Sequence, residues 1–427
     1  MNSHMLIVLL ALICITTLAF AADKPDPSAP AVECTPRAGL PNTLAKLRAN
    51  QPLTIAYIGG SITAADGWRP QTTKWFSDQF PNSTITEVNA AIGGTGSDLG
   101  VFRFARDVLA HNPNLIFVEF AVNDGGAPPA QIHRCIEGIV RQAWKHDPNI
   151  DLCFVYTLVD GMVPTLAKGQ LNRSAAAMEQ VADHYNIPTI HMGLEVVRLA
   201  TAGQMIMKTE GLTPDQMAAL KDKMIFAADG VHPRNNTGHR LYTEAVARSI
   251  DKMRAFATPA PHKLPAPFVA DHYEAAKLIP LTHAKLSDGF VKLPATDRLA
   301  RSFGKFLPDL YAAKHPGDSL SFKFRGAYAG FYDLLGPDCG QLTATLDAKP
   351  VTILRFDSFC TYHRMGSFVV AKDLPDTVHT VQVTVDSKLP DKPAILAKRN
   401  EKLDDPKRFE GANWYVGWIM IIGEMAD

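Results

Sequence analysis

Apolar residues in the first half of the chain fall into short runs separated by longer stretches with helical periodicity. Five of these runs predict strands, over residues 53–58, 85–91, 115–120, 152–156 and 188–192. Helical spacing predicts helices over residues 98–110, 130–144 and 237–253. Strands that are apolar along their whole length and alternate with helices are typical of a parallel sheet covered on both faces. We therefore predict a three-layer α/β/α domain over residues 46–257.

The pattern changes after residues 256–268, a segment with four prolines that indicates a domain boundary. Residues 319–325 and 380–386 alternate with period two, and turn residues separate such segments. We predict an antiparallel β-sandwich, jelly-roll-like, over residues 258–427, with the Pro-rich linker at its start. The last predicted strand, residues 414–422, is apolar on both faces. We therefore expect it to pack against its own core and against the first domain.

An apolar run without charged side chains opens the chain, over residues 5–22. It ends in Ala19-Phe20-Ala21, the small-x-small pattern that signal peptidase accepts. The run is short for a spanning helix, which needs ~20 apolar residues. We predict a signal peptide over residues 1–21, an extended tether over residues 22–45, and a secreted or periplasmic protein without stable membrane insertion after cleavage. An uncleaved anchor is the alternative.

Composition excludes some classes of protein. The chain has 427 residues, 46% of them hydrophobic and 20% charged, which is typical of a globular protein and not of a disordered one. The 43 Lys and Arg residues balance the 43 Asp and Glu residues. Nucleic acids and anionic membranes select strongly basic surfaces, so we expect neither as a partner through bulk charge.

Cysteines beyond the predicted signal peptide are Cys34, Cys135, Cys153, Cys339 and Cys360. None forms a CxxC pair, so nothing indicates a zinc ribbon or thioredoxin-like chemistry. In an exported protein, Cys339 with Cys360 is the most plausible local disulfide. The odd count leaves at least one free thiol, and we expect Cys135 and Cys153 to be buried as small apolar residues.

Polar residues follow several of the predicted strands. Ser61 follows the first strand in a Gly-Gly-Ser turn, Gly94 follows the second, and Asn123 follows the third. Asp229 and His232 stand three residues apart just before the last predicted helix. Open α/β sheets place their sites at the carboxyl ends of the strands, so we expect these side chains to meet.

These residue types suit acyl transfer. Serine needs an adjacent base to act as a nucleophile, and His232 can supply one to Ser61. Asp229 is near enough in sequence to orient the histidine and stabilise its charged form. The backbone N–H groups of Ser61 and Gly94, with the side-chain amide of Asn123, would form the oxyanion hole.

The same residues, in the same chain order, resemble the four sequence blocks of the SGNH hydrolase family, also called GDSL esterases/lipases. The resemblance covers residues 50–255 and implies a flavodoxin-like α/β/α fold with ester hydrolysis. The first block reads Gly-Gly-Ser-Ile instead of Gly-Asp-Ser-Leu, so the polar residue before the serine is missing. The chain also resembles exported carbohydrate esterases of this family, which pair such a domain with a β-sandwich.

That resemblance implies a serine esterase that removes acyl groups, acetyl first among them, from an acylated carbohydrate, with no cofactor and no metal. A lipase or thioesterase acting on lipid or acyl-carrier esters is the alternative enzyme, with residues 193–220 as an apolar groove or lid. A second alternative is a carbohydrate-binding protein without activity, in which the sandwich is the functional part. Neither the polysaccharide, the position of the acyl group nor the oligomeric state is indicated.

Other residues have a structural interpretation beside a functional one. His239 could ligate a metal with His232, but no HExxH-like cluster accompanies it. Asp124 either shapes the pocket or caps a helix, and we expect His191 to be structural. We expect Trp68 and Trp75 to be core residues more than substrate platforms. The loop cluster Tyr362-His363-Arg364 is either an exposed turn or a pocket rim.

Overall fold

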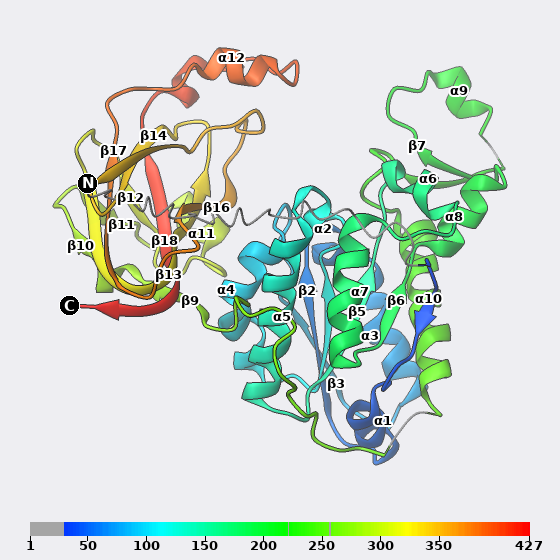
Figure 1. Ribbon diagram of the computed structural model, residues 1–427. Coiled ribbons are helices and arrows are strands. Elements are labelled where there is room, and N and C mark those ends of the chain that lie inside the picture. Colours follow the sequence, from blue (N-terminus) through cyan, green and yellow to red (C-terminus); the bar gives the residue numbers. More distant parts are fainter. Residues whose placement is uncertain (1–29, 221, 256–257) are drawn as a thin grey trace, which may run out of the picture.

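The computed structural model describes residues 30–220, 222–255 and 258–427, which form an α/β domain followed by an antiparallel β domain (Figure 1). The predicted signal peptide and the first part of the predicted tether lie outside the described residues. In the described part of the chain, no helix is long and apolar enough to cross a membrane.

A six-stranded sheet forms the centre of the α/β domain, with the strand order β1-β6-β5-β4-β2-β3. Its strands are β1 (Cys34–Thr35), β2 (Leu53–Gly59), β3 (Ile85–Asn89), β4 (Leu115–Glu119), β5 (Asp151–Tyr156) and β6 (Thr189–His191). Strands β2 to β6 pair in parallel, and β1 joins the β6 edge antiparallel. The parallel strands follow the flavodoxin-like order, so the predicted fold of this domain is confirmed and all five predicted strands are present.

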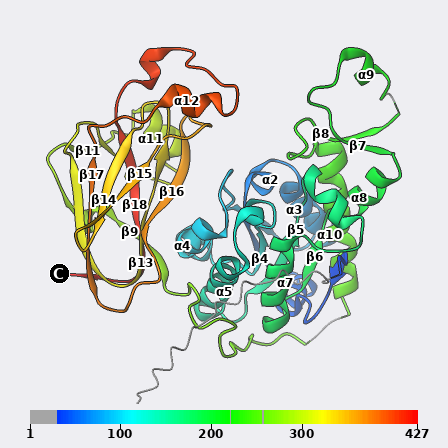
Figure 2. The ribbon, with the colours of Figure 1, turned by 45° about the horizontal axis from the view of Figure 1, so that its top comes forward.

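Helices cover both faces of the sheet (Figure 1 and Figure 2). They are α1 (Pro41–Arg48), α2 (Ser61–Ala64), α3 (Trp68–Gln79), α4 (Ser97–Asp107), α5 (Pro129–His146), α6 (Val163–Leu166), α7 (Arg173–Tyr185), α8 (Leu194–Thr201), α9 (Pro214–Ala218) and α10 (Arg240–Met253). Short turns complete the domain: η1 (Leu109–His111), η2 (Asn123–Gly126), η3 (Asp160–Met162) and the π-helix η4 (Asn235–His239). Helices α4, α5 and α10 confirm the three predicted helices.

The two faces of the sheet have separate cores. Helices α4, α5 and α7 pack on one face, and α3, α8 and α10 pack on the other. Adjacent strand residues point to opposite faces, so Ile58 of β2 belongs to the first core and Tyr57 to the second. Each strand is therefore apolar along its whole length, and the polar residues that could form a site follow the strand ends.

The tether predicted over residues 22–45 is wrong from residue 34 onward. Residues 34 and 35 form strand β1 on the edge of β6. Helix α1 begins at Pro41 and buries Leu44 and Leu47. The prolines that suggested an extended chain include Pro41 in the first turn of α1, where a missing N–H costs no hydrogen bond. This segment belongs to the α/β domain.

A small unit projects from the sheet between α8 and η4. Strands β7 (Met205–Lys208) and β8 (Met224–Ala227) pair in parallel, and α9 lies between them in the chain. Figure 1 shows α9 standing clear of the central sheet. Neither strand is predicted from the sequence, since four residues are too few to establish a period of two. Strand β8 leads directly into the segment that contains Asp229 and His232.

The C-terminal part is an antiparallel sheet of ten strands. They are β9 (Ala276–Pro280), β10 (Lys285–Leu286), β11 (Phe290–Lys292), β12 (Tyr311–Ala313), β13 (Ser319–Leu335), β14 (Gln341–Leu346), β15 (Lys349–Leu354), β16 (Arg364–Ala371), β17 (Val378–Val385) and β18 (Trp414–Ala426). Its connections contain η5 (Leu281–His283), α11 (Arg298–Phe303), α12 (Lys392–Ala397) and η6 (Pro406–Phe409). Strands β13, β17 and β18 contain the three predicted segments, so the predicted antiparallel domain is confirmed.

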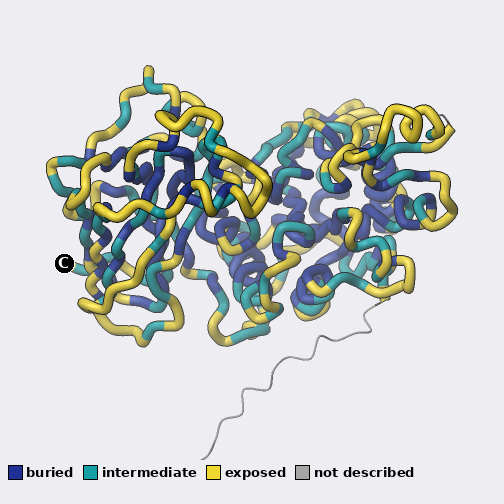
Figure 3. The backbone as a smooth tube through the Cα atoms, turned by 90° about the horizontal axis from the view of Figure 1, so that it is seen from above, coloured by how far each residue is buried: buried dark blue, intermediate teal, exposed yellow. Residues whose placement is uncertain are grey.

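The two domains share an apolar core, as the last strand predicts. Trp414 of β18 packs in the core of the β domain, whereas Met420 of the same strand joins the cluster that contains α4 and α5. Phe102 of α4 and Tyr328 of β13 lie 4.8 Å apart between ring centroids. Figure 3 shows buried segments inside both domains and exposed segments at their outer loops. The β domain is therefore docked and does not swing freely.

The Pro-rich linker is packed against the α/β domain as well. His262 stacks on Trp144 with 4.8 Å between ring centroids, and its ring lies 2.8 Å from a carboxylate oxygen of Asp151. The carboxylate of Glu137 accepts the backbone N–H of Val269 at 2.8 Å. These contacts fix the path of the chain between the domains.

All five described cysteines are buried free thiols, so the predicted Cys339–Cys360 disulfide is wrong. Cys339 packs in the core shared by the domains, whereas Cys360 packs in a separate small cluster with Phe356 and Phe409. Burial raises the pKa of both thiols, to about 12 for Cys360. Cys339 and Cys360 are near one another in the sequence, but their side chains lie in different clusters.

Candidate active site

The five residues predicted to perform chemistry lie at one edge of the parallel sheet. Ser61 is the first residue of α2 and stands directly after β2. Gly94 lies in the loop after β3, and Asn123 begins η2 after β4. Asp229 and His232 lie between β8 and η4. Because parallel strands end at the same edge, residues far apart in the sequence come together there.

Ser61, His232 and Asp229 form a continuous chain of hydrogen bonds. Nε2 of His232 lies 2.8 Å from Oγ of Ser61, and Nδ1 lies 2.6 Å from Oδ2 of Asp229. Oδ1 of Asp229 accepts the backbone N–H groups of Val231 and His232, both at 2.9 Å. Gly230 between them has a φ of +77°, a left-handed conformation that glycine adopts without strain. The arrangement is that of a nucleophile, a base and an orienting carboxylate.

The carboxyl group of Asp229 stays ionised. Partial burial acts to raise its pKa, but hydrogen bonds from the backbone and ring of His232 and from Val231 outweigh it and lower the pKa to about 2. A charged carboxylate can stabilise the imidazolium that forms when His232 accepts a proton. The side chains of His232 and Asp229 are 52% and 43% exposed, so both are open to solvent.

The loop of Gly94 lies beside the nucleophile. A Cβ atom on Gly93 would stand 3.5 Å from Cβ of Ser61, so the loop passes directly over the serine. Gly94 has a φ of +73°, which favours glycine at this position. No other heavy atom lies within 4 Å of the place where its side chain would be, so its backbone faces open space.

Asn123 lies against Gly60, the residue before Ser61. A Cβ atom on Gly60 would overlap Oδ1 of Asn123 and would stand 3.0 Å from its Nδ2. The asparagine amide therefore occupies the room that a side chain at position 60 would need. In this chain, a side chain at position 60 would therefore displace the amide of Asn123.

A buried glutamate beneath the nucleophile turn was not among the predicted residues. Glu119 ends β4, and its carboxylate accepts the hydroxyls of Thr63 at 2.9 Å and Thr157 at 2.7 Å. Burial raises its pKa, and the backbone N–H of Gly60 is among the donors that oppose this. Glu119 thus connects the turn before Ser61 to β4 and β5. A charged residue ending an otherwise apolar strand is the sequence signal that could have indicated it.

The other sequence candidates have structural roles. Nδ1 of His191 accepts the backbone N–H of Gly193 at 3.3 Å, and Nδ1 of His239 accepts that of Trp68 at 3.1 Å. Burial lowers the pKa of each histidine to about 4, so both are neutral near pH ~7. Trp68 is a core residue and Trp75 packs against the same core, as predicted. In the described part of the chain, no group of three or more metal-ligating side chains is present.

Asp124 caps a helix, which was one of its two predicted roles. Its Oδ1 accepts the backbone N–H of Ser97, the first residue of α4, at 2.9 Å. The N-cap residue Gly96 has no side chain with which to cap the helix itself. Asp124 therefore connects the loop of Gly94 to the turn of Asn123.

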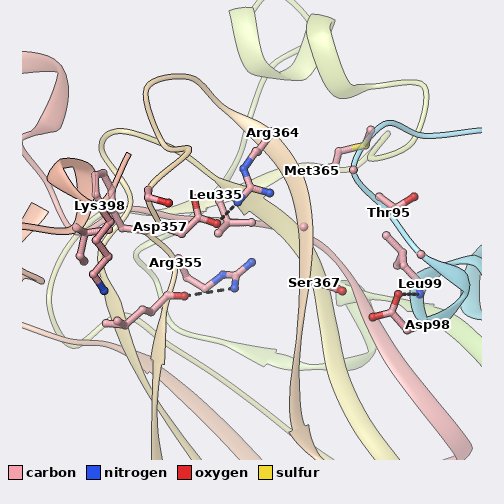
Figure 4. A pocket seen from close by; sticks show the side chains of 17 residues that line it. Thr95, Asp98, Leu99, Leu335, Arg355, Asp357, Arg364, Met365, Ser367 and Lys398 are labelled. Atoms are coloured by element: carbon pink, nitrogen blue, oxygen red, sulfur yellow. Dashed lines mark hydrogen bonds and ion pairs between the residues drawn. The ribbon is translucent and has the colours of Figure 1, made fainter. Parts of the chain in front are cut away.

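A pocket of about 610 Å³ opens between the two domains (Figure 4). Its α/β wall consists of Gly94, Thr95, Gly96, Asp98 and Leu99. Its β wall consists of Leu335, Leu354, Arg355, Phe356, Asp357, Ser358, Arg364, Met365, Gly366, Ser367, Ile395 and Lys398. Since Gly94 lines the pocket and the adjoining Gly93 lies against Ser61, the pocket begins beside the nucleophile.

The β wall mixes apolar side chains with polar and charged ones, and its cations Arg355, Arg364 and Lys398 outnumber its one carboxylate, Asp357. Arg364 forms an ion pair with Asp357, and Nε of Arg355 donates to Asp333 at 2.7 Å. In Figure 4 Arg355, Asp357 and Arg364 lie across the pocket from Thr95 and Asp98. Guanidinium groups and hydroxyls offer hydrogen bonds to a ligand.

The cluster Tyr362-His363-Arg364 divides between its two predicted roles. Arg364 lines the interdomain pocket, as a rim residue would. Tyr362 and His363 line a separate hollow on the β domain, and Tyr362 is 57% exposed, as in an ordinary turn. The polar character of the loop is visible in the sequence, but the direction of each side chain is not.

A flavodoxin-like sheet with a serine, a histidine and an aspartate in hydrogen-bond contact at its strand ends has the arrangement of a serine hydrolase. Residues 57–241 match the GDSL-like Lipase/Acylhydrolase family, so the α/β domain belongs to this family of carboxylic ester hydrolases. The resemblance drawn from the motifs is thereby confirmed. No curated protein matches the chain in sequence.

Solved structures with both domains are similar to this chain. A two-domain esterase active on acetylated mannans, co-crystallised with mannopentaose, has 19% identity and a TM-score of 0.68, covering 90% of this chain and 94% of that chain. A second structure of such an esterase has 19% identity and a TM-score of 0.70, covering 92% and 97%. An acetyl xylan esterase from Geobacillus stearothermophilus has 19% identity and a TM-score of 0.34 over 46% of this chain and 94% of that chain. The first two share the two-domain fold with this chain.

Proposed function

We propose that this protein is an exported serine esterase that removes acyl groups, with acetyl preferred, from a carbohydrate. The observation that carries the proposal is the hydrogen-bonded chain Ser61–His232–Asp229, with distances of 2.8 and 2.6 Å, beside an interdomain pocket. Similarity across both domains to an esterase active on acetylated mannans supports a carbohydrate substrate. The signal peptide predicted over residues 1–21 supports export.

In the first half of the reaction, Oγ of Ser61 attacks the ester carbonyl and Nε2 of His232 takes its proton. The ionised Asp229 stabilises the imidazolium through Nδ1. The oxyanion accepts hydrogen bonds from the backbone N–H groups of Ser61 and Gly94 and from the amide of Asn123. Each such donor is worth about 3–4 kcal/mol of transition-state stabilisation.

The tetrahedral intermediate then collapses and the bond to the sugar oxygen breaks. His232 gives its proton to that oxygen, so the deacylated sugar leaves as a neutral alcohol. A water molecule attacks the acyl-serine with His232 again as base, and the acid product leaves as Ser61 regains its proton. The residues named supply every proton transfer, so the reaction as written needs no cofactor.

The pocket between the domains would hold the carbohydrate. It begins at Gly94, in the loop that passes over Ser61, so a sugar bound there would extend toward the nucleophile. Hydroxyl groups of Ser358 and Ser367 and the paired guanidinium of Arg364 would bond to sugar hydroxyls.

The test is a panel of esters that separates acyl length from the leaving group. We expect hydrolysis of nitrophenyl acetate well above that of nitrophenyl decanoate, and release of acetate from acetylated mannan or xylan. A marked preference for decanoate assigns the lipase or thioesterase function instead. Binding of deacetylated polysaccharide with no hydrolysis of any ester assigns the non-enzymatic alternative.

A further inference from the structure

A buried carboxyl group lies between the two segments that carry the oxyanion donors. Asp124 follows Asn123 in η2 and is only 4% exposed. Its Oδ1 accepts the Ser97 backbone N–H at 2.9 Å, but its Oδ2 is buried without a hydrogen-bond partner in the described part of the chain. A buried polar atom without a partner lowers stability, so stability alone does not account for this residue.

Asp124 is placed to hold the Gly94 loop. Ser97, whose N–H it accepts, is three residues after Gly94. A Cβ atom on Gly96 would overlap Oδ1 of Asp124, so the loop approaches the carboxylate closely. A Cβ atom on Gly94 would meet no atom within 4 Å outside the adjoining residues, so no distant side chain packs on that side of Gly94. The hydrogen bond to Asp124 is therefore the nearest polar link between this loop and the neighbouring turn.

On its other side, Asp124 is joined by one peptide bond to Asn123, whose amide lies against Gly60. We propose that Asp124 is a positioning residue of the oxyanion hole: it holds the loop of Gly94 beside Asn123, so that the donors of both reach the same oxygen. The inference rests on the proposed esterase reaction, and it adds a residue that touches neither the substrate nor the reacting atoms.

The charge of Asp124 depends on pH near neutrality. The titratable groups that face it are Asp98 on α4 and Glu119 at the end of β4, and the thiol of Cys135 on α5 lies near it. Burial outweighs the hydrogen bonds from Ser97 and raises the pKa of Asp124 from 3.8 to about 7. Below that pH the carboxyl is neutral and accepts a weaker hydrogen bond.

The sign of the effect on stability is opposite to that on activity. Because the folded-state pKa lies above the unfolded value, folding favours the protonated form, and stability is lost as the pH rises through about 7. The ionised form, which holds the loop more strongly, is thus the less stable one.

The test uses Asp124→Ala, which removes the acceptor, and Asp124→Asn, which keeps an acceptor oxygen without a charge. The matched control is Asp151→Asn, since Asp151 is also buried and accepts a backbone N–H, that of Thr43 at 2.7 Å, at the opposite end of the sheet. For each folded variant, kcat and KM on nitrophenyl acetate are measured from about pH 5 to about pH 9, with Tm at both ends.

We expect Asp124→Ala to lower kcat about 100-fold with little change in KM, because misplaced donors weaken the transition state more than the ground state. Asp124→Asn should retain more activity than Asp124→Ala and have a higher Tm than the parent only at high pH. Asp151→Asn should lower Tm and leave kcat unchanged. If Asp124→Ala does not fold, kcat, KM and Tm of Asp124→Asn decide alone.

The proposal is overturned if both Asp124 variants keep the parent's kcat per folded enzyme. Failure of the esterase assignment is distinguishable, because in that case Ser61→Ala would be as active as the parent whatever the Asp124 variants do.

Discussion

At the scale of single residues, the site depends on a position where no side chain fits. Gly60 has no room for a Cβ atom because the Asn123 amide already lies there. We expect Gly60→Ala to displace that amide and to lower kcat/KM about 10²–10³-fold, the usual cost of one lost oxyanion donor. The assay is hydrolysis of nitrophenyl acetate by folded protein.

The control for that substitution is Gly161→Ala. A Cβ atom on Gly161 would meet no other atom within 4 Å, so this variant should keep the parent's activity. Parent-like activity of Gly60→Ala would show that Asn123 does not act from its observed place.

The meeting of Ser61, His232 and Asp229 could be predicted because their types and spacing suit acyl transfer. Asp229 and His232 are three residues apart, and a local turn is enough to join them. The burial of Glu119 and of Asp124 could not be predicted in this way. Their importance comes from burial among groups that are distant in the sequence. The sequence alone does not show whether a carboxylate is buried or exposed.

At the scale of elements, the turn between β2 and α2 is held from below by Glu119. Replacing Glu119 with alanine leaves the hydroxyls of Thr63 and Thr157 buried without their acceptor. We expect Glu119→Ala to lower the free energy of unfolding by about 3 kcal/mol, measured by urea titration. Glu119→Gln keeps one acceptor oxygen and should lose less.

A loss below about 0.5 kcal/mol in Glu119→Ala, typical of a surface substitution, would contradict this role. The comparison of Ala with Gln separates lost hydrogen bonds from lost volume, since Gln preserves the size of the side chain.

The strands that were predicted are those whose apolar runs are long enough to be read without ambiguity, such as β2 and β4. Strand β1 has two residues, and β7 and β8 have four each, so neither a period nor a run identifies them. Pairing with a distant strand determines these elements, and that pairing is a property of the tertiary fold.

At the scale of the whole molecule, docking of the domains could be predicted from β18, because a strand that is apolar on both faces must pack against another element on each face. The pocket that docking creates could not be predicted. It joins residues near position 95 to residues near positions 357 and 398, and no sequence pattern records that approach.

The β wall of the pocket should affect polysaccharides more than small esters. Lys398 lines the pocket, and its ammonium group can donate to sugar hydroxyls. We expect Lys398→Ala to raise KM for an acetylated oligosaccharide about three- to tenfold, the worth of one hydrogen bond, and to leave nitrophenyl acetate unaffected.

The matched control is Lys402→Ala, an exposed lysine four residues further on that does not line the pocket. Equal KM values for Lys398→Ala and the parent on the oligosaccharide would place the carbohydrate outside this part of the wall.

The central claim is that Ser61 is the nucleophile of an ester hydrolase, and Ser61→Ala tests it most directly. The matched control is Ser77→Ala, on the exposed face of α3. Ser61→Ala should fold with an unchanged Tm and lose at least about 10⁴-fold in kcat on nitrophenyl acetate, as when a nucleophile is removed. Hydrolysis by Ser61→Ala at the rate of the parent would contradict the account.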